Sequence, residues 1–138
     1  MNAPDFPRIQ PPVTEIARPY WEGCREGELR LQRCTACEQF QFYPRIVCSH
    51  CGADSFEWQA VSGRGTVVSF TVVRRGISPA YVAPYVVALI DLEEGPRLMS
   101  TVVGCEPEAV QVGAAVSVQF EPWGAEHVLP VFTLSPER

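Results

Sequence analysis

Apolar and polar residues alternate along much of this chain, and the alternation predicts strands rather than helices. Polar and apolar residues alternate in residues 28–33, just before a first pair of cysteines, and again in residues 39–43, just after that pair. Pro44 ends the second run, and Phe56 and Trp58 mark a third short strand. Three short strands arranged around cysteines predict a small ribbon-like sheet.

The second half of the chain predicts five longer strands, because its apolar runs are separated by turn residues. We expect them at residues 66–74, 85–92, 97–103, 115–121 and 129–134. In the first of them, the alternation places Val68, Phe70 and Val72 on one face.

A short helical segment is expected between the third and fourth of these strands. Residues 106–111 fit one or two helical turns, since Pro107 stands early and Gly113 follows the end. Five strands with a short helix in this place have the chain order of an OB-fold barrel.

The N-terminal residues follow a different pattern. Residues 1–13 include four prolines and are expected to form an extended arm that lies on this protein or on a neighbour. Thr14 can cap a helical segment, and Pro19 suits only a first turn. We therefore predict a helix from Pro19 to Glu26 that ends before Gly27.

Tyr20 and Trp21 are large side chains for so short a helix, and two interpretations stay open. Their rings either pack onto the ribbon or contact a partner protein, because Trp and Tyr are enriched at interface hot spots. Cys24 is expected on a face of the same helix.

The candidate metal ligands are two Cys-x-x-Cys pairs, Cys34 with Cys37 and Cys48 with Cys51. Each pair forms a tight turn that offers two sulfur atoms, and the strands between them bring the turns together into a tetrahedral site. Four protein ligands leave no open position for water, so we expect a structural zinc ion and no metal catalysis. The bound metal contributes about 10 kcal/mol or more to folding of so small a unit.

Other interpretations of the cysteines stay open. Disulfides require an oxidising compartment, and the first residues contain no cationic segment followed by an apolar core that would direct export. Four-thiolate iron of the rubredoxin kind has similar spacing. His50, inside the second turn, is expected to face solvent. We predict an all-β protein with an N-terminal arm and short helix (1–27), a rubredoxin-like zinc ribbon (28–62) and a five-stranded OB-fold barrel (63–138).

The amino-acid composition indicates a globular protein that does not enter a membrane. An apolar share of 46 per cent and a charged share of 20 per cent are ordinary for a globular protein. The longest apolar run, Tyr81 to Ile90, is interrupted by Pro84 and is shorter than the roughly 20 residues of a membrane helix. We expect a soluble, cytoplasmic protein that does not enter a membrane.

Charge weakens the case for nucleic-acid binding. The net charge is −5, and residues 76–138 hold two arginines against eight acids. Nucleic-acid affinity depends on neutralising phosphates, so this balance is unfavourable, although zinc ribbons and OB folds often bind nucleic acid. Every basic residue is arginine, so no lysine can form a Schiff base.

Several ordered motifs together resemble one protein family. They are Pro19-Tyr20-Trp21-Glu22-Gly23, Gly27-Glu28-Leu29, the two cysteine pairs, Tyr43-Pro44-Arg45, Glu57-Trp58 and Gly63-x-Gly65-Thr66-Val67. Over nearly the whole chain the sequence resembles the DUF35 family of zinc-ribbon plus OB-fold proteins. One departure is Glu38, which stands where many members have Gly in a turn that favours left-handed backbone.

The resemblance implies an accessory subunit that partners a thiolase-fold enzyme in a hetero-oligomer. Such pairings serve acyl-CoA metabolism and include thiolases and thiolase-like aldolases that act on steroid side chains. The resemblance implies that the four cysteines are zinc ligands. It implies no catalytic residue.

The loop at residues 76–84 is the candidate ligand-binding surface, because OB folds often bind through such loops. Arginines can contact phosphates and aromatic rings can cover an apolar chain, so we assign an acyl-CoA contact there. The candidate residues are Arg64, Phe70, Arg74, Arg75, Tyr81 and Tyr85.

Independent catalysis is the weakest alternative. Cys24 and Cys105 are the remaining thiols, and His127 is a candidate base with no recognisable triad partner. The main rival to an accessory subunit is a nucleic-acid-binding module.

Overall fold

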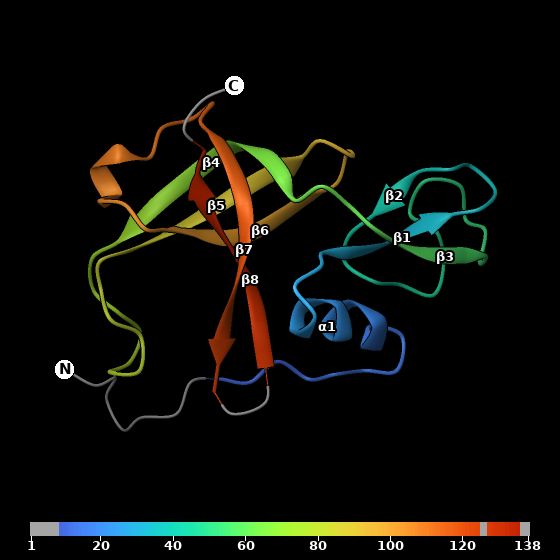
Figure 1. Ribbon diagram of the computed structural model, residues 1–138, viewed down its shortest axis with the longest axis horizontal. Helices are drawn as coiled ribbons and strands as arrows, with labels where there is room; N and C mark the ends of the chain where they lie inside the picture. Colours follow the sequence, from blue (N-terminus) through green and yellow to red (C-terminus); the bar gives the residue numbers. More distant parts are fainter. Residues whose placement is uncertain (1–8, 125–126, 136–138) are drawn as a thin grey trace.

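The computed structural model describes residues 9–124 and 127–135 and places its strands in two sheets (Figure 1). The first part contains α1 (Arg18–Arg25), β1 (Arg30–Cys34), β2 (Phe40–Gln41) and β3 (Phe56–Ala60). The second part contains β4 (Arg64–Val73), β5 (Tyr85–Leu92), β6 (Arg97–Val103), the 3₁₀ helix η1 (Pro107–Ala109), β7 (Ala115–Trp123) and β8 (His127–Leu134).

The first sheet is the predicted ribbon, with strand order β2-β1-β3 and antiparallel pairing throughout. Gln32, in the central strand β1, pairs with Gln41 on one side and with Trp58 on the other. The short strands leave both cysteine pairs in the turns at one end of this sheet, which is the arrangement that the sequence predicted.

The second sheet closes into a barrel with strand order β4-β5-β6-β8-β7. Its pairs are antiparallel except for β6 and β8, which run parallel through Val102 opposite Phe132. This order, with η1 between the third and fourth barrel strands, is that of an OB fold. The predicted all-β class is confirmed.

Some element boundaries differ from the predicted ones. Strand β7 ends later and strand β8 begins earlier than predicted, because their pairing continues to Trp123 and His127 at the hairpin. The segment expected as one or two helical turns is a single 3₁₀ turn. Helix α1 begins at Arg18, and Thr14 instead accepts the N–H of Ala17 at 3.3 Å in the turn before it.

A β-bulge in β4 modifies the predicted alternation. The register against β5 shifts between Val67 and Ser69, so Val68 is the extra residue. Val67 is fully buried before the bulge, while Phe70 and Val72 lie half-buried against the core after it.

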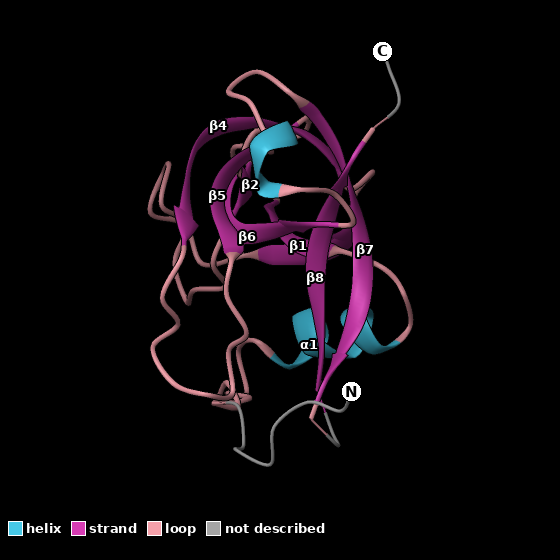
Figure 2. Cartoon of the chain, turned by 90° about the vertical axis from the view of Figure 1, so that its left-hand side faces the viewer, coloured by secondary structure: helices cyan, strands magenta, loops and turns pink. Residues whose placement is uncertain are grey.

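One hydrophobic core joins the barrel, the helix and the ribbon. Phe132, Ile90 and Val116 are buried in the barrel, and Leu29 and Leu31 extend the same cluster toward the ribbon. Helix α1 lies beside the hairpin end of β7 and β8, as both views show (Figures 1 and 2). The helix therefore fills the space between the two sheets.

The N-terminal arm lies on the barrel from residue 9 onward, and residues 1–8 of the predicted arm lie outside the described chain. The backbone N–H of Ile9 donates to the hydroxyl of Tyr81 at 2.8 Å, and Trp123 Nε1 donates to the carbonyl of Ile9 at 2.8 Å. Within the described residues, no helix is long and apolar enough to cross a membrane.

Candidate functional site

The four predicted ligands converge in the turns of the ribbon. The Sγ atoms of Cys34, Cys37, Cys48 and Cys51 lie within 4.8 Å of one another. Cys34 and Cys51 are 3.7 Å apart at sulfur, and Cys37 and Cys48 are 3.6 Å apart. In a tetrahedron with zinc–sulfur bonds of about 2.3 Å, neighbouring sulfurs are about 3.8 Å apart. Two sulfur pairs already have this separation, and the other pairs lie within 4.8 Å, so the cluster is suited to a zinc ion.

Backbone N–H groups of the turns favour the thiolate form of Cys34 and Cys48, one cysteine from each pair. The N–H of Cys37 lies 3.5 Å from Cys34 Sγ, and it is the largest influence that lowers the pKa of Cys34. Burial acts to raise the pKa of Cys48, but hydrogen bonds from the N–H groups of His50 and Cys51 and from the thiols of Cys37 and Cys34 together bring that pKa to about 7. Burial and the neighbouring sulfurs in turn raise the pKa of Cys37 to about 12. Deprotonated sulfur is the form that binds metal.

Glu38 and His50 lie in the two cysteine turns, where the sequence made a prediction for each. Glu38 adopts a φ of 67°, which is the left-handed backbone conformation that the sequence predicted in this turn. His50 is exposed, and its Nε2 lies 3.1 Å from the carbonyl oxygen of Phe40 rather than at the metal site. The predicted solvent-facing position of His50 is confirmed.

The two remaining cysteines are not part of the cluster. Cys24 is 1 per cent exposed on the inner face of α1, and burial raises its pKa to about 12. Cys105 is half-buried against the core. Cys24 therefore lacks the exposure and the thiolate character that a nucleophile requires.

The structure separates the predicted phosphate-binding arginines. Arg64 opens β4 and forms an ion pair with Glu93 at 3.0 Å, whereas Arg74 and Arg75 follow the other end of this strand. A strand of ten residues spans about 30 Å, so one phosphate cannot reach both ends. Arg74 lies 3.4 Å from Glu108 in an exposed pair.

The predicted aromatic residues Tyr81 and Tyr85 do meet, in a groove of about 370 Å³. The groove lies beside the 76–84 loop, and its other walls include Ile77, Val82 and Trp123. The ring centroids of Tyr81 and Trp123 are 5.9 Å apart. Phe70 is not among the lining residues and packs against the core instead.

A second groove, of about 500 Å³, lies between the ribbon and the barrel. Tyr20 and Trp21 both line it, with Met99 exposed on its rim. Tyr20 is only 4 per cent exposed and packs edge-on against Phe42 at 5.6 Å, so its ring is mainly a packing element. The prediction of a partner contact stays open for Trp21.

Sequence reasoning missed Trp123 and Glu121, which line both grooves. Only the closure of the barrel brings Glu121 beside Tyr81 and Thr101. No local signal identified Trp123, because its position depends on the extended β7–β8 hairpin.

Two family models match in succession. The rubredoxin-like zinc ribbon domain of ChsH2 matches residues 21–57, and the C-terminal OB-fold domain of ChsH2 matches residues 58–121. A DUF35 domain-containing scaffold protein of Methanothermobacter thermautotrophicus is 32% identical over 110 residues, which are 78% of this chain and 83% of that protein. The chain belongs to the DUF35 family. Its cysteine cluster is the metal site of a zinc ribbon.

Other relatives of this DUF35 protein have names from acyl-CoA metabolism. A probable enoyl-CoA hydratase alpha subunit of Thermomonospora curvata is 36% identical over 127 residues. The match covers 91% of this chain but 39% of that subunit. Benzoylsuccinyl-CoA thiolase subunit BbsA of Geobacter metallireducens is 30% identical over 105 residues, which are 73% of this chain and 65% of that subunit.

A solved structure has the same fold along nearly the whole chain. A chain of the Ltp2-ChsH2(DUF35) aldolase superposes with a TM-score of 0.83 at 33% identity. The superposition covers 91% of this chain and 98% of that one.

Proposed function

We propose that this DUF35 protein is a non-catalytic subunit that binds a thiolase-type enzyme and contributes to holding its acyl-CoA. The observation that carries the proposal is the match to the DUF35 chain of an aldolase over 98% of that chain. The name of the relative BbsA, a subunit of an acyl-CoA thiolase, supports the same class of partner.

The chemistry of the described residues supports an accessory role. The zinc cluster has four thiolate ligands, so it offers no position at which a substrate could be activated. Cys24 is buried with a raised pKa, and so it is unsuited to covalent catalysis. A subunit of this kind acts by binding and positioning.

The 370 Å³ groove is the proposed contact for the acyl-CoA. Its walls are mostly apolar side chains, among them Ile77, Val82 and Val103, with a few polar groups such as Glu121. This composition is typical of small-molecule sites. Arg75 is exposed and lies two residues before Ile77, so a chain seated in the groove places its phosphates within reach of positive charge.

Charge reversal tests the ligand contact. Changing Arg74→Glu together with Arg75→Glu should weaken CoA retention by the complex about tenfold or more, since each lost charge-assisted contact is worth about 1.5–3 kcal/mol. Arg64→Glu is the matched control, because Arg64 lies at the other end of the same strand. Equal retention by all three proteins, with folding intact, would contradict this assignment.

Affinity capture tests the partner. The tagged protein is recovered from its native lysate with and without nuclease, and the bound proteins are identified by mass spectrometry. We expect a thiolase-fold enzyme that survives nuclease treatment. Recovery of nuclease-sensitive RNA- or DNA-bound material in its place would favour a nucleic-acid-binding module and overturn the proposal.

A further inference from the structure

The N-terminal arm meets the barrel at two aromatic residues of the groove that we assign to the acyl-CoA. The backbone N–H of Ile9 donates to the hydroxyl oxygen of Tyr81, and the carbonyl of Ile9 accepts the indole N–H of Trp123, both at 2.8 Å. Tyr81 and Trp123 line the 370 Å³ groove, while Trp123 and Ile9 line the 500 Å³ groove. A piece of main chain therefore lies at the boundary between the two grooves.

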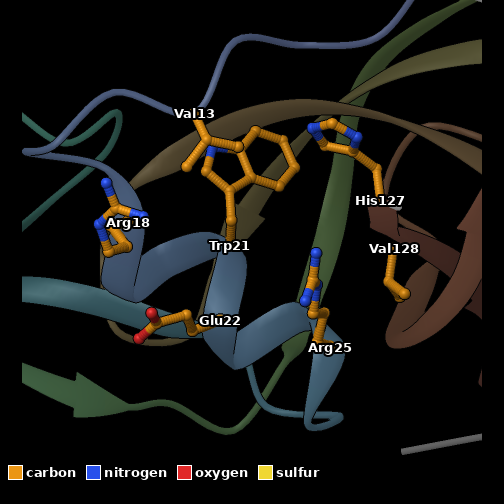
Figure 3. A pocket seen from close by; sticks show the side chains of 7 residues that line it. All are labelled: Val13, Arg18, Trp21, Glu22, Arg25, His127 and Val128. Atoms are coloured by element: carbon orange, nitrogen blue, oxygen red, sulfur yellow. The ribbon is translucent and has the colours of Figure 1, made fainter. Parts of the chain in front are cut away.

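Ile9 is held at this place mainly by its backbone. The residue is 71 per cent exposed, and both of its hydrogen bonds lie at the exposed surface, where each adds little net stability. Farther along the arm, Val13 lies beside the indole of Trp21, in a pocket of about 150 Å³ between α1 and β8 (Figure 3). The arm can therefore release Ile9 while it stays attached at Val13.

Tyr81 and Trp123 present two complementary hydrogen-bonding groups. The tyrosine hydroxyl can accept a hydrogen bond, whereas the indole N–H can only donate one. Their ring centroids are 5.9 Å apart, so the pair receives an N–H and a C=O that are close together on one chain, as those of Ile9 are. The β-alanine unit of pantetheine, the flexible part of coenzyme A, carries the same two groups on either side of two methylene carbons. The chemistry of the pair therefore fits pantetheine.

We propose that Tyr81 and Trp123 bind the pantetheine chain of the acyl-CoA, and that Ile9 occupies this site until the ligand displaces it. The inference rests on the proposed acyl-CoA contact and extends it to two specific hydrogen bonds. A pantetheine N–H replaces that of Ile9 at Tyr81, and a pantetheine carbonyl accepts the indole N–H of Trp123. Because Trp123 also lines the 500 Å³ groove, the bound chain can continue into that groove.

Competition by the arm sets the affinity. Only molecules in which Ile9 has left the pair can bind the ligand, so the apparent dissociation constant rises as the bound fraction of the arm rises. A change that weakens the hold of Ile9 should therefore tighten ligand binding.

NMR of the isotope-labelled full chain tests the displacement during a titration with pantetheine. The backbone N–H signal of Ile9 and the indole N–H signal of Trp123 report the two hydrogen bonds that the ligand replaces. The indole signal of Trp58, in the ribbon strand β3, reports general effects. We expect the signals of Ile9 and Trp123 to shift saturably with one dissociation constant, while that of Trp58 stays unchanged.

Two variants at the same position test the competition. Ile9→Pro removes the N–H that binds Tyr81, whereas Ile9→Ala, the matched control, keeps it. We expect Ile9→Pro to bind pantetheine about three- to tenfold more tightly than the unchanged protein, as expected for loss of one competing hydrogen bond. Ile9→Ala should bind like the unchanged protein. Equal affinity of the two variants would overturn the inference.

The groove residues Val87 and Val103 separate this inference from the proposed function. Saturable shifts of their signals without a change at Ile9 and Trp123 would overturn the displacement and leave the acyl-CoA contact standing. No saturable shift in the groove with either pantetheine or coenzyme A would overturn both.

Discussion

The side-chain amide of Gln41 donates a hydrogen bond to Oε1 of Gln32 at 2.7 Å, and both residues are buried in the ribbon. Gln32 also accepts the backbone N–H of Arg45 at 2.9 Å and donates to the carbonyl of Arg45 at 3.0 Å. Gln41 accepts the N–H of Ser49 at 2.8 Å, beside the zinc ligand Cys48. This pair connects the strands to the loop that carries the second cysteine turn.

Replacing Gln32→Ala should lower the free energy of unfolding of the ribbon by about 2–3 kcal/mol, because it leaves the buried amide of Gln41 and the N–H of Arg45 without an acceptor. It should also speed zinc loss to a chelator, measured with a colorimetric zinc indicator. Gln59→Ala, on the exposed side of β3, is the control. Equal zinc-release rates for the two variants would show that the pair does not support the metal site.

Replacing Cys48→Ser should abolish tight zinc binding and unfold the ribbon, since metal binding supplies about 10 kcal/mol or more of the folding free energy of such a unit. Metal content by atomic emission should fall from one zinc per chain to almost none. Cys105→Ser should keep its zinc, because Cys105 lies outside the cluster. Full zinc content in the Cys48 variant would refute the four-thiolate assignment.

The raised pKa of the buried Cys24 thiol should make the free energy of unfolding depend on pH. Its folded pKa of about 12 exceeds the ordinary thiol value of about 8.5, so between these pH values the unfolded chain loses a proton that the folded chain keeps. Deprotonation then favours unfolding, and stability should fall as the pH rises from 8 to 10. Urea unfolding should show a smaller fall for Cys24→Ala than for Cys105→Ala. An identical pH dependence in the two variants would be inconsistent with a protonated, buried Cys24.

Glu38 offers a stabilising substitution. Its φ of 67° is costly for a residue with a side chain, whereas glycine adopts it readily. Glu38→Gly should raise the free energy of unfolding by about 1 kcal/mol, as measured by thermal unfolding of the zinc-bound protein. Glu38→Ala removes the same charge and keeps a Cβ, so it should give no gain. If both variants were equally stable, backbone strain at this position would not be the cause.

Local patterns were sufficient to predict much of this fold. The cysteine spacing predicted the metal ligands, and the apolar run from Tyr85 to Leu92 predicted β5 with its observed bounds. The separation of Arg64 from Arg74 could not be predicted from the sequence, because it depends on how far β4 extends. The packing of α1 against the β7–β8 hairpin also escaped prediction, since only tertiary pairing decides how long that hairpin is.

Native mass spectrometry of the captured complex measures directly whether this chain is a subunit of a thiolase-fold enzyme. We expect one species that contains this 15.3 kDa chain, one bound zinc ion and subunits of the enzyme. Release of the enzyme subunits on mild activation should leave the zinc on the small chain. A preparation in which this chain occurs only by itself, or only with nucleic acid, would show that it is not such a subunit.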